Sequence, residues 1–193
     1  MSKVVVSELA APFDSNGTIE VASGDYIYVP GTVIQTVWVR SRTRTVIATA
    51  ATGDGAAITS LNLTITPKLA TSMMLVQWTI NGEMHQDNVF TILQDSLLIT
   101  TAGYEGYNNV AGNVRYSGFT AAGYDQNEDS TPTNWYIQYY IPAGSTASRV
   151  YAPAVRSSSA GVYSLALNRT ILSAGQDAYE AMLSTGVVME IAQ

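Results

Sequence analysis

The chain has 193 residues, of which 12% are charged, and a net charge of −6 at pH 7. This length suits one domain that can bury its own core, and a charged share well below the usual value of about a quarter is typical of a β-rich protein whose polar faces are hydroxyls and amides. The lack of cysteine excludes disulfides, thiolate metal sites and a thiol nucleophile, and the acidic balance argues against a general nucleic-acid binder.

Residues 1–30 are predicted to form an extended N-terminal arm rather than part of the core. They hold two short apolar patches, KVVVSEL and TIEVASGDYIYVP, separated by the turn-rich APFDSNG. An isolated short hairpin is marginally stable in water, so the arm is expected to lie against the main domain or against neighbouring subunits. The N-terminal apolar run is too short for a signal peptide or a membrane span, and we expect a soluble protein made in a cytoplasm, with no membrane insertion.

Residues 31–193 are predicted to form one all-β domain, because short alternating stretches recur between polar turns. The expected strands cover residues 32–39, 61–66, 73–80, 89–93, 97–100, 134–141, 148–155, 162–168 and 184–192. Alternation places Leu61, Leu63 and Ile65 on one face of their strand, and Met74, Val76, Trp78 and Ile80 on one face of theirs. About eight strands at this spacing indicate an antiparallel, jelly-roll-like β-sandwich, with a short helix or a loop at 173–183.

The stretch GEMHQDN, residues 82–88, contains the only histidine. Glu83 and Asp87 would lie about 13 Å apart in an extended strand, too far to share one metal ion with His85. Asn81-Gly82 is typical of a tight turn, but a two-residue hairpin there would place charges opposite apolar residues. We therefore expect a longer loop through 83–88, with His85 as a loop or rim residue and no metal.

No nucleophile elbow, P-loop or dinucleotide fingerprint occurs in the chain. Paired carboxylates for glycoside hydrolysis could come from residues in 101–132, although acidic loops are usually only solvated. These residues are Glu105, Asp125, Glu128 and Asp129. The sequence therefore favours a non-enzymatic protein that needs no cofactor.

Residues 101–132 form a long stretch rich in Gly, Asn and Tyr. Its aromatic residues are candidates for surface recognition, because long loops in compact domains are usually functional and Tyr among small polar residues is a favoured contact surface. They are Tyr104, Tyr107, Tyr116, Phe119 and Tyr124. The alternative is another strand pair, such as 113–121, whose aromatic side chains pack inward.

The one basic cluster is RSRTR, in which Arg40, Arg42 and Arg44 would share one face of an extended strand. Such a face could contact a phosphate or a carboxylate, or could simply be solvated or paired with acids on another chain. We favour the second reading and take the three arginines as candidate inter-subunit contacts.

Several words of the main domain appear in the same order in a known group of proteins. They are PGTVIQTVWV (30–39), LNLTITPKLATSMMLVQW (61–78), IQYYIPAGSTA (137–147), LALNRT (165–170) and DAYEAMLSTGVVMEIAQ (177–193). In these words the chain resembles tailed-phage virion proteins, common in marine and cyanobacterial phages and described as tail-fibre-like or structural. Related sequences open with a short extended segment ending in Pro-Gly, as residues 1–31 do, but tend to carry Lys-Ile where this chain has Met73-Met74.

The resemblance implies an antiparallel β-sandwich that trimerises and sits on a virion as a fibre tip, a tail appendage or a capsid decoration. The implied partners are further copies of the chain, other virion proteins and a host-surface glycan or protein. The family supplies no catalytic residues. A free carbohydrate-binding module or adhesin domain is the alternative, since it would share the sandwich and the exposed tyrosines.

Overall fold

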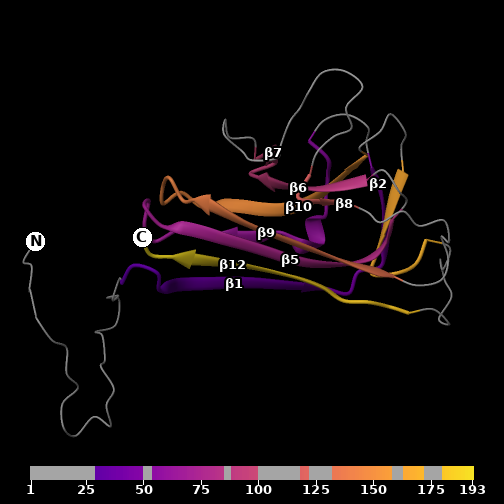
Figure 1. Cartoon of the computed structure of the whole chain (residues 1–193), viewed down its shortest axis with the longest axis horizontal. Coiled ribbons are helices and arrows are strands. Elements are labelled where there is room, and N and C mark those ends of the chain that lie inside the picture. The colour runs from indigo at the N-terminus through magenta and orange to yellow at the C-terminus, as the bar shows by residue number, and fades with distance from the viewer. Residues whose placement is uncertain are drawn as a thin grey trace, which may run out of the picture.

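The computed structural model describes residues 29–49, 54–84, 88–99, 118–121, 132–157, 163–171 and 180–193. These residues form twelve β-strands in two antiparallel sheets, together with one short 3-10 turn at Thr59–Leu61. Figure 1 shows β1, β12, β5 and β9 running side by side, with β10 and β6 lying along them. The prediction of an all-β antiparallel sandwich is confirmed. In the described part of the chain, no helix is long and apolar enough to cross a membrane.

Sheet A is built around one long central strand, β5. Its members are β1 (Val33–Ser41), β2 (Thr45–Thr49), β5 (Met73–Met84), β9 (Thr133–Pro142), β11 (Tyr163–Leu167) and β12 (Ser184–Ile191). One edge of β5 pairs with β9, and the other edge pairs first with β12 and then, at its far end, with β11. β1 pairs with β12 and β2 with β11, so β1 and β2 follow one another along the outside of this arrangement.

Sheet B is built around the pair β6 and β10. Its members are β3 (Ala56–Ala57), β4 (Leu63–Ile65), β6 (Asn88–Gln94), β7 (Leu97–Leu98), β8 (Thr120–Ala121) and β10 (Arg149–Ser157). β3 and β4 pair with the other edge of β10, and β7 and β8 with the other edge of β6. Asp95 and Ser96 connect β6 to β7 with φ of 52° and 69°, as in the type I′ turn that suits a two-residue hairpin.

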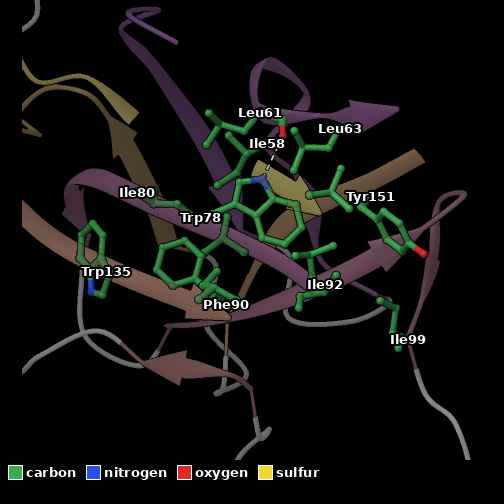
Figure 2. Packing of buried hydrophobic residues seen from close by; sticks show 14 of the residues in the cluster. Ile58, Leu61, Leu63, Trp78, Ile80, Phe90, Ile92, Ile99, Trp135 and Tyr151 are labelled. Carbon is green, nitrogen blue, oxygen red and sulfur yellow. Dashed lines mark hydrogen bonds between the residues drawn. The ribbon is translucent and has the colours of Figure 1, made fainter. Parts of the chain in front are cut away.

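The core lies between the two sheets and is filled by the residues that alternation singled out. Leu61, Leu63, Ile65, Met74, Val76, Trp78 and Ile80 are each exposed by 2% or less, which confirms the predicted inward faces. Figure 2 shows Trp78 at the centre of the packed group, with its indole N–H donating to the carbonyl of Leu61 at 3.0 Å. The ring of Phe90 on β6 lies 5.4 Å from that of Trp135 on β9, so aromatic side chains of both sheets meet in the core.

The loop expected through residues 83–88 is wrong at both of its ends, because β5 continues through Asn81 and Gly82 to Met84 and β6 already begins at Asn88. Gly82 is extended, pairs on both edges, and has the carbonyl oxygen of Ala166 only 2.2 Å from where a Cβ would stand. Glycine is present here because two backbones approach closely, not because the chain reverses. Residues 85–87, which separate β5 from β6, lie outside the described part, as do most residues of the helix or loop expected at 173–183.

A buried polar network lies at the junction where pairing along the edge of β5 passes from β12 to β11. At the same level the outer strand changes from β1 to β2. Asn168, in the left-handed conformation with φ 57°, donates its amide to the carbonyls of Ser41 and Thr43, both at 3.0 Å. Its side-chain oxygen accepts a hydrogen bond from the Ser184 hydroxyl at 2.6 Å, and its backbone N–H donates to the backbone carbonyl of Asn81 at 2.8 Å. This one side chain therefore satisfies backbone groups that the ladder leaves unpaired.

A second buried polar group, Glu190 on β12, anchors the connection from β4 to β5. Its carboxylate accepts the backbone N–H of Lys68 at 2.8 and 2.9 Å, the N–H of Leu69 at 2.9 Å and the Ser72 hydroxyl at 2.7 Å. The Gln35 amide donates to Oε2 of Glu190 at 2.5 Å, whereas Leu69 and Ser72 donate to Oε1. Burial by itself would raise the pKa of Glu190, but these hydrogen bonds together hold the pKa below the ordinary 4.5.

We predict that Glu190→Gln destabilises the fold by about 2–3 kcal/mol at pH 7, because an amide cannot accept all the donors that face the carboxylate. A carboxyl group whose pKa is lowered by folding stabilises the protein above its unfolded pKa and loses this contribution as the pH falls through the folded value. The gap between wild type and variant should therefore close below about pH 4.5 in urea unfolding curves. Glu180→Gln, at an exposed carboxylate, is the control, and a gap that persists at low pH would contradict the prediction.

We also predict that Asn168→Ala costs about 3 kcal/mol, because two carbonyls and a hydroxyl lose their partner and alanine disfavours the left-handed backbone. Asn168→Gly keeps the backbone conformation but not the hydrogen bonds, so it should recover about 1 kcal/mol of that loss. Denaturant unfolding of both variants measures the two contributions. Stabilities within about 0.5 kcal/mol of wild type for both would show that the network is dispensable.

Candidate functional site

The outer face of sheet A, which points away from the core, carries exposed aromatic side chains. Register places Arg40, Thr185, Thr79 and Tyr136 in one cross-strand row and Trp38, Val187, Gln77 and Gln138 in the next. A third row holds Thr36, Met189, Leu75 and Tyr140. Trp38 is 67% exposed, Tyr136 52% and Tyr140 49%, which is unusual for three large rings on one sheet face.

Two of these rings stand on either side of a shallow trough of about 320 Å³. Trp38 belongs to β1 and Tyr136 to β9, and the two intervening strands form the floor. The lining residues are Trp38, Val39, Arg40, Gln77, Trp78, Thr79, Tyr136, Thr185, Gly186 and Val187. The trough therefore has aromatic margins and a floor of amide, hydroxyl and small apolar groups.

Hydrogen bonds fix the Tyr136 side of the trough. The Gln77 amide donates to the Tyr136 hydroxyl at 2.8 Å, and that hydroxyl donates to the Gln138 side-chain oxygen at 2.7 Å. Because the phenol is tied to both neighbours, its ring is held in place before any partner arrives. Such preorganisation reduces the entropy lost on binding.

Gly186 lies in the floor of the trough, and its core-facing side is filled by Trp78. It lies on β12 directly above Trp78, and a Cβ built on it would stand 2.5 Å from one atom of that indole and 2.6 Å from another. Position 186 faces inward, between the outward-facing Thr185 and Val187, so the absence of a side chain here leaves room in the core for the indole of Trp78. Any side chain at position 186 would have to displace the central residue of the core.

Of the predicted recognition residues, the structure describes Phe119 only. It is half-buried, packs against the core and meets Tyr139 edge-on at 5.2 Å, immediately before β8. This placement fits the alternative in which aromatic side chains of the stretch pack inward. The other four candidates, Tyr104, Tyr107, Tyr116 and Tyr124, lie outside the described residues, and so do Glu105, Asp125, Glu128 and Asp129.

The three arginines do not follow one continuous strand, because β1 ends at Ser41 and β2 begins only at Thr45. All three are exposed. Arg40 borders the trough beside Trp38, whereas Arg42 and Arg44 line a separate hollow of about 370 Å³ with residues 181–183. The bend between the two strands divides the cluster, and its role between subunits stays a prediction.

Glu83 is buried on β5 and not part of a loop. Its carboxylate accepts the backbone N–H of Ile171 at 2.6 Å, so it holds the segment after β11. His85 and Asp87 lie outside the described residues. Among the residues that are described, no three His, Cys, Asp or Glu side chains come close enough to hold a metal ion.

Comparison with known proteins gives no family. No family model and no curated protein matches the chain. A chain in the structure of infectious bursal disease virus, Gx strain, is similar at 13% identity with a TM-score of 0.33. The similarity covers 82% of this chain but only 37% of that one. At this level the likeness shows neither a shared family nor a shared function.

Trp38 and Tyr136 do not stand out in the sequence as site residues, although the alternation of their strands places each on the outer face. Trp38 falls between Val37 and Val39, which face inward, and Tyr136 falls between Trp135 and Ile137, which are buried. Strands that are apolar on both faces do not reveal which face is covered, and only the register showed that these two rings border the same trough.

We predict that Trp38→Phe removes most of the tryptophan fluorescence that acrylamide can quench. The other two tryptophans, Trp78 and Trp135, are exposed by 1% and 5%. Because Trp38 is a surface residue, the free energy of unfolding should change by no more than about 0.5 kcal/mol. Trp78→Phe is the matched control: it should lose stability and leave quenching unchanged. If acrylamide quenches Trp38→Phe as strongly as the wild type, Trp38 is not the accessible tryptophan, and its ring must be covered.

Proposed function

We propose that the chain is a non-enzymatic virion structural protein, a trimeric surface fibre or capsid decoration. Residues 1–30 would attach it to the particle, and the sandwich would be presented for host-surface contact or particle stabilisation. The observation that carries this proposal is the exposed aromatic face of sheet A, because clustered rings on an otherwise well-buried sandwich are typical of a contact surface.

The point at which the chain enters the sandwich, residues 29–32, supports the proposal. Val29 to Thr32 form a Pro-Gly turn, in which the Thr32 N–H donates to the Val29 carbonyl at 3.0 Å and Gly31 has φ 87°. The turn is tied to Ala192 by hydrogen bonds of 2.8 and 2.9 Å. Trp38 lies six residues further along an extended strand, about 20 Å away. The chain therefore enters sheet A at the start of β1, and the trough lies toward the other end of this strand.

The words that carry the resemblance to phage virion proteins coincide with the anchoring contacts of the fold. LALNRT contains Asn168, and the closing MEIAQ contains Glu190. The words PGTVIQTVWV and TPKLATSMM supply the partners of Glu190, namely Gln35, Lys68, Leu69 and Ser72. These contacts determine a scaffold, and the proposal that the scaffold serves a virion rests on the resemblance.

Trimer formation follows from the same proposal, since homo-oligomers close by symmetry and a three-fold axis suits a fibre or a knob. The exposed Arg40, Arg42 and Arg44 are proposed to meet acids of a neighbouring copy. Other virion proteins would hold the arm, and a glycan or protein of the host surface would meet the outer face. Three weak sites on one trimer could give strong adhesion without a tight pocket.

The alternative is a free carbohydrate-binding module or adhesin domain. The trough between Trp38 and Tyr136 favours it equally, because such a module needs a ring-lined surface and no particle. The alternative predicts a monomer that binds oligosaccharide and is absent from purified particles.

We predict that the full chain elutes as a trimer and is present on purified particles, and that a version starting at Gly31 folds but no longer attaches. Thermal melting checks folding, light scattering gives the mass, and quantitative mass spectrometry of washed particles gives the copy number. Trp38→Ala with an intact arm is the matched control and should attach normally. Attachment of the shortened chain equal to that of the full chain would exclude the arm as the anchor, and a monomer absent from particles would favour the alternative.

A further inference from the structure

We propose that the trough on the outer face of sheet A binds saccharide, with Trp38 and Tyr136 stacking on sugar rings and Gln77, Thr79 and Thr185 hydrogen-bonding to their hydroxyls. The inference deepens the host-surface contact proposed above and takes its biological role from it. Its physical basis is separate, because it depends only on the groups that line the trough.

The trough combines the two kinds of surface that a pyranose ring presents. A sugar has apolar C–H faces, which pack on aromatic rings, and a rim of hydroxyls, which both donate and accept hydrogen bonds. Trp38 and Tyr136 offer the aromatic faces, and the Gln77 amide and the Thr79 and Thr185 hydroxyls offer neutral donors and acceptors. Among the residues that the structure describes, no carboxylate lines the trough, and Arg40 is the one charged lining residue. The ligand that fits is polyhydroxylated and neutral or mildly acidic.

The size and layout suit a short oligosaccharide. A volume of about 320 Å³ is at the lower end of the usual range for small-ligand pockets. Trp38 and Tyr136 are three strand spacings apart and two residues out of line, about 16 Å at the level of the backbone, and both side chains border the space between. Tyr140 lies on the same face about 13 Å further along β9, where a longer chain of sugars would meet a third exposed ring.

The layout is less suited to a protein partner. Protein interfaces place apolar groups at the centre and polar groups at the rim. Here the amide and hydroxyl groups of Gln77, Thr79 and Thr185 share the floor with Val187 and Gly186 while the rings stand at the margins, so the centre is not a purely apolar patch. The Gln77 and Gln138 side chains also hold Tyr136 in place by hydrogen bonds, as in a site formed before binding. A second copy of the chain is therefore the less favoured occupant.

The test is titration of the full-length protein with maltotriose, cellotriose, N,N′,N″-triacetylchitotriose and trigalacturonate, followed by tryptophan fluorescence and ligand-observed NMR. We expect at least one probe to bind and to shift the emission of Trp38. Trp38→Ala and Tyr136→Ala should each weaken binding about tenfold, the effect of one lost stacking contact. Leu97→Ala, which removes an equally exposed apolar side chain on β7 of sheet B, should leave affinity unchanged.

Further variants separate the chemistry of the ligand from the stability of the protein. Gln77→Leu removes a donor and frees the Tyr136 hydroxyl, and should weaken binding while melting stays within a few degrees of wild type. Arg40→Gln should weaken binding of trigalacturonate only if the site takes acidic sugars. If Gln77→Leu binds every probe more weakly while its melting temperature is unchanged, the hydrogen-bonding role of the floor is supported. Unchanged binding would contradict this role.

Failure to bind any of the four probes would overturn the inference. So would loss of the trimer in Trp38→Ala or Tyr136→Ala without saccharide binding, because the face would then be an interface between copies. A protein that is present on particles but binds no sugar would leave the proposed function standing and remove this inference alone. A protein that binds sugar but is absent from particles would keep the trough as a saccharide site and reject the virion role.

Discussion

The sandwich depends on β5 remaining extended over its full length. This strand pairs with β9 along one edge and with β12 and β11 in succession along the other, so it connects every part of sheet A. Continuity requires Gly82, because the backbone of Ala166 fills the space that a Cβ would occupy. Trp78 on the same strand fills the core, while Gln77 and Thr79 face outward into the trough. The core and the candidate site are thus opposite faces of one strand.

Two buried polar side chains fix the register around this strand. Asn168 holds the junction where paired strands succeed one another, and Glu190 holds the connection that leads into β5. A buried group of this kind is costly unless every partner is in place, so it disfavours alternative registers more than it adds to stability. Asn168 lies in the segment LALNRT and Glu190 in the closing segment MEIAQ. These two segments hold the scaffold together, and the aromatic residues lie on its outer face.

The positions of the Pro-Gly turn and of the trough along β1 connect the fold with the proposed function. The Pro-Gly turn at the start of β1 is tied to the last residues of the chain, and the trough lies toward the opposite end of the same strand. Gly186 leaves room in the core for the Trp78 indole beneath the trough, and the Gln77 and Gln138 side chains hold Tyr136 on the outer face. An extended sheet thus separates the end that would be held from the face that would make contact.

The sequence by itself determined the strands with clean alternation, the inward faces of β4 and β5, and hence the all-β sandwich, because side chains in a strand alternate between faces at every residue. It did not determine β2, the continuity of β5 through Asn81-Gly82, or the burial of Glu83 and Glu190, since these depend on partners far away in the chain. Asn-Gly has the local preference of a turn, and only pairing with both β9 and β11 keeps it extended. The trough was likewise decided by tertiary structure, because Trp38 and Tyr136 are about a hundred residues apart and come together only through the pairing of four strands.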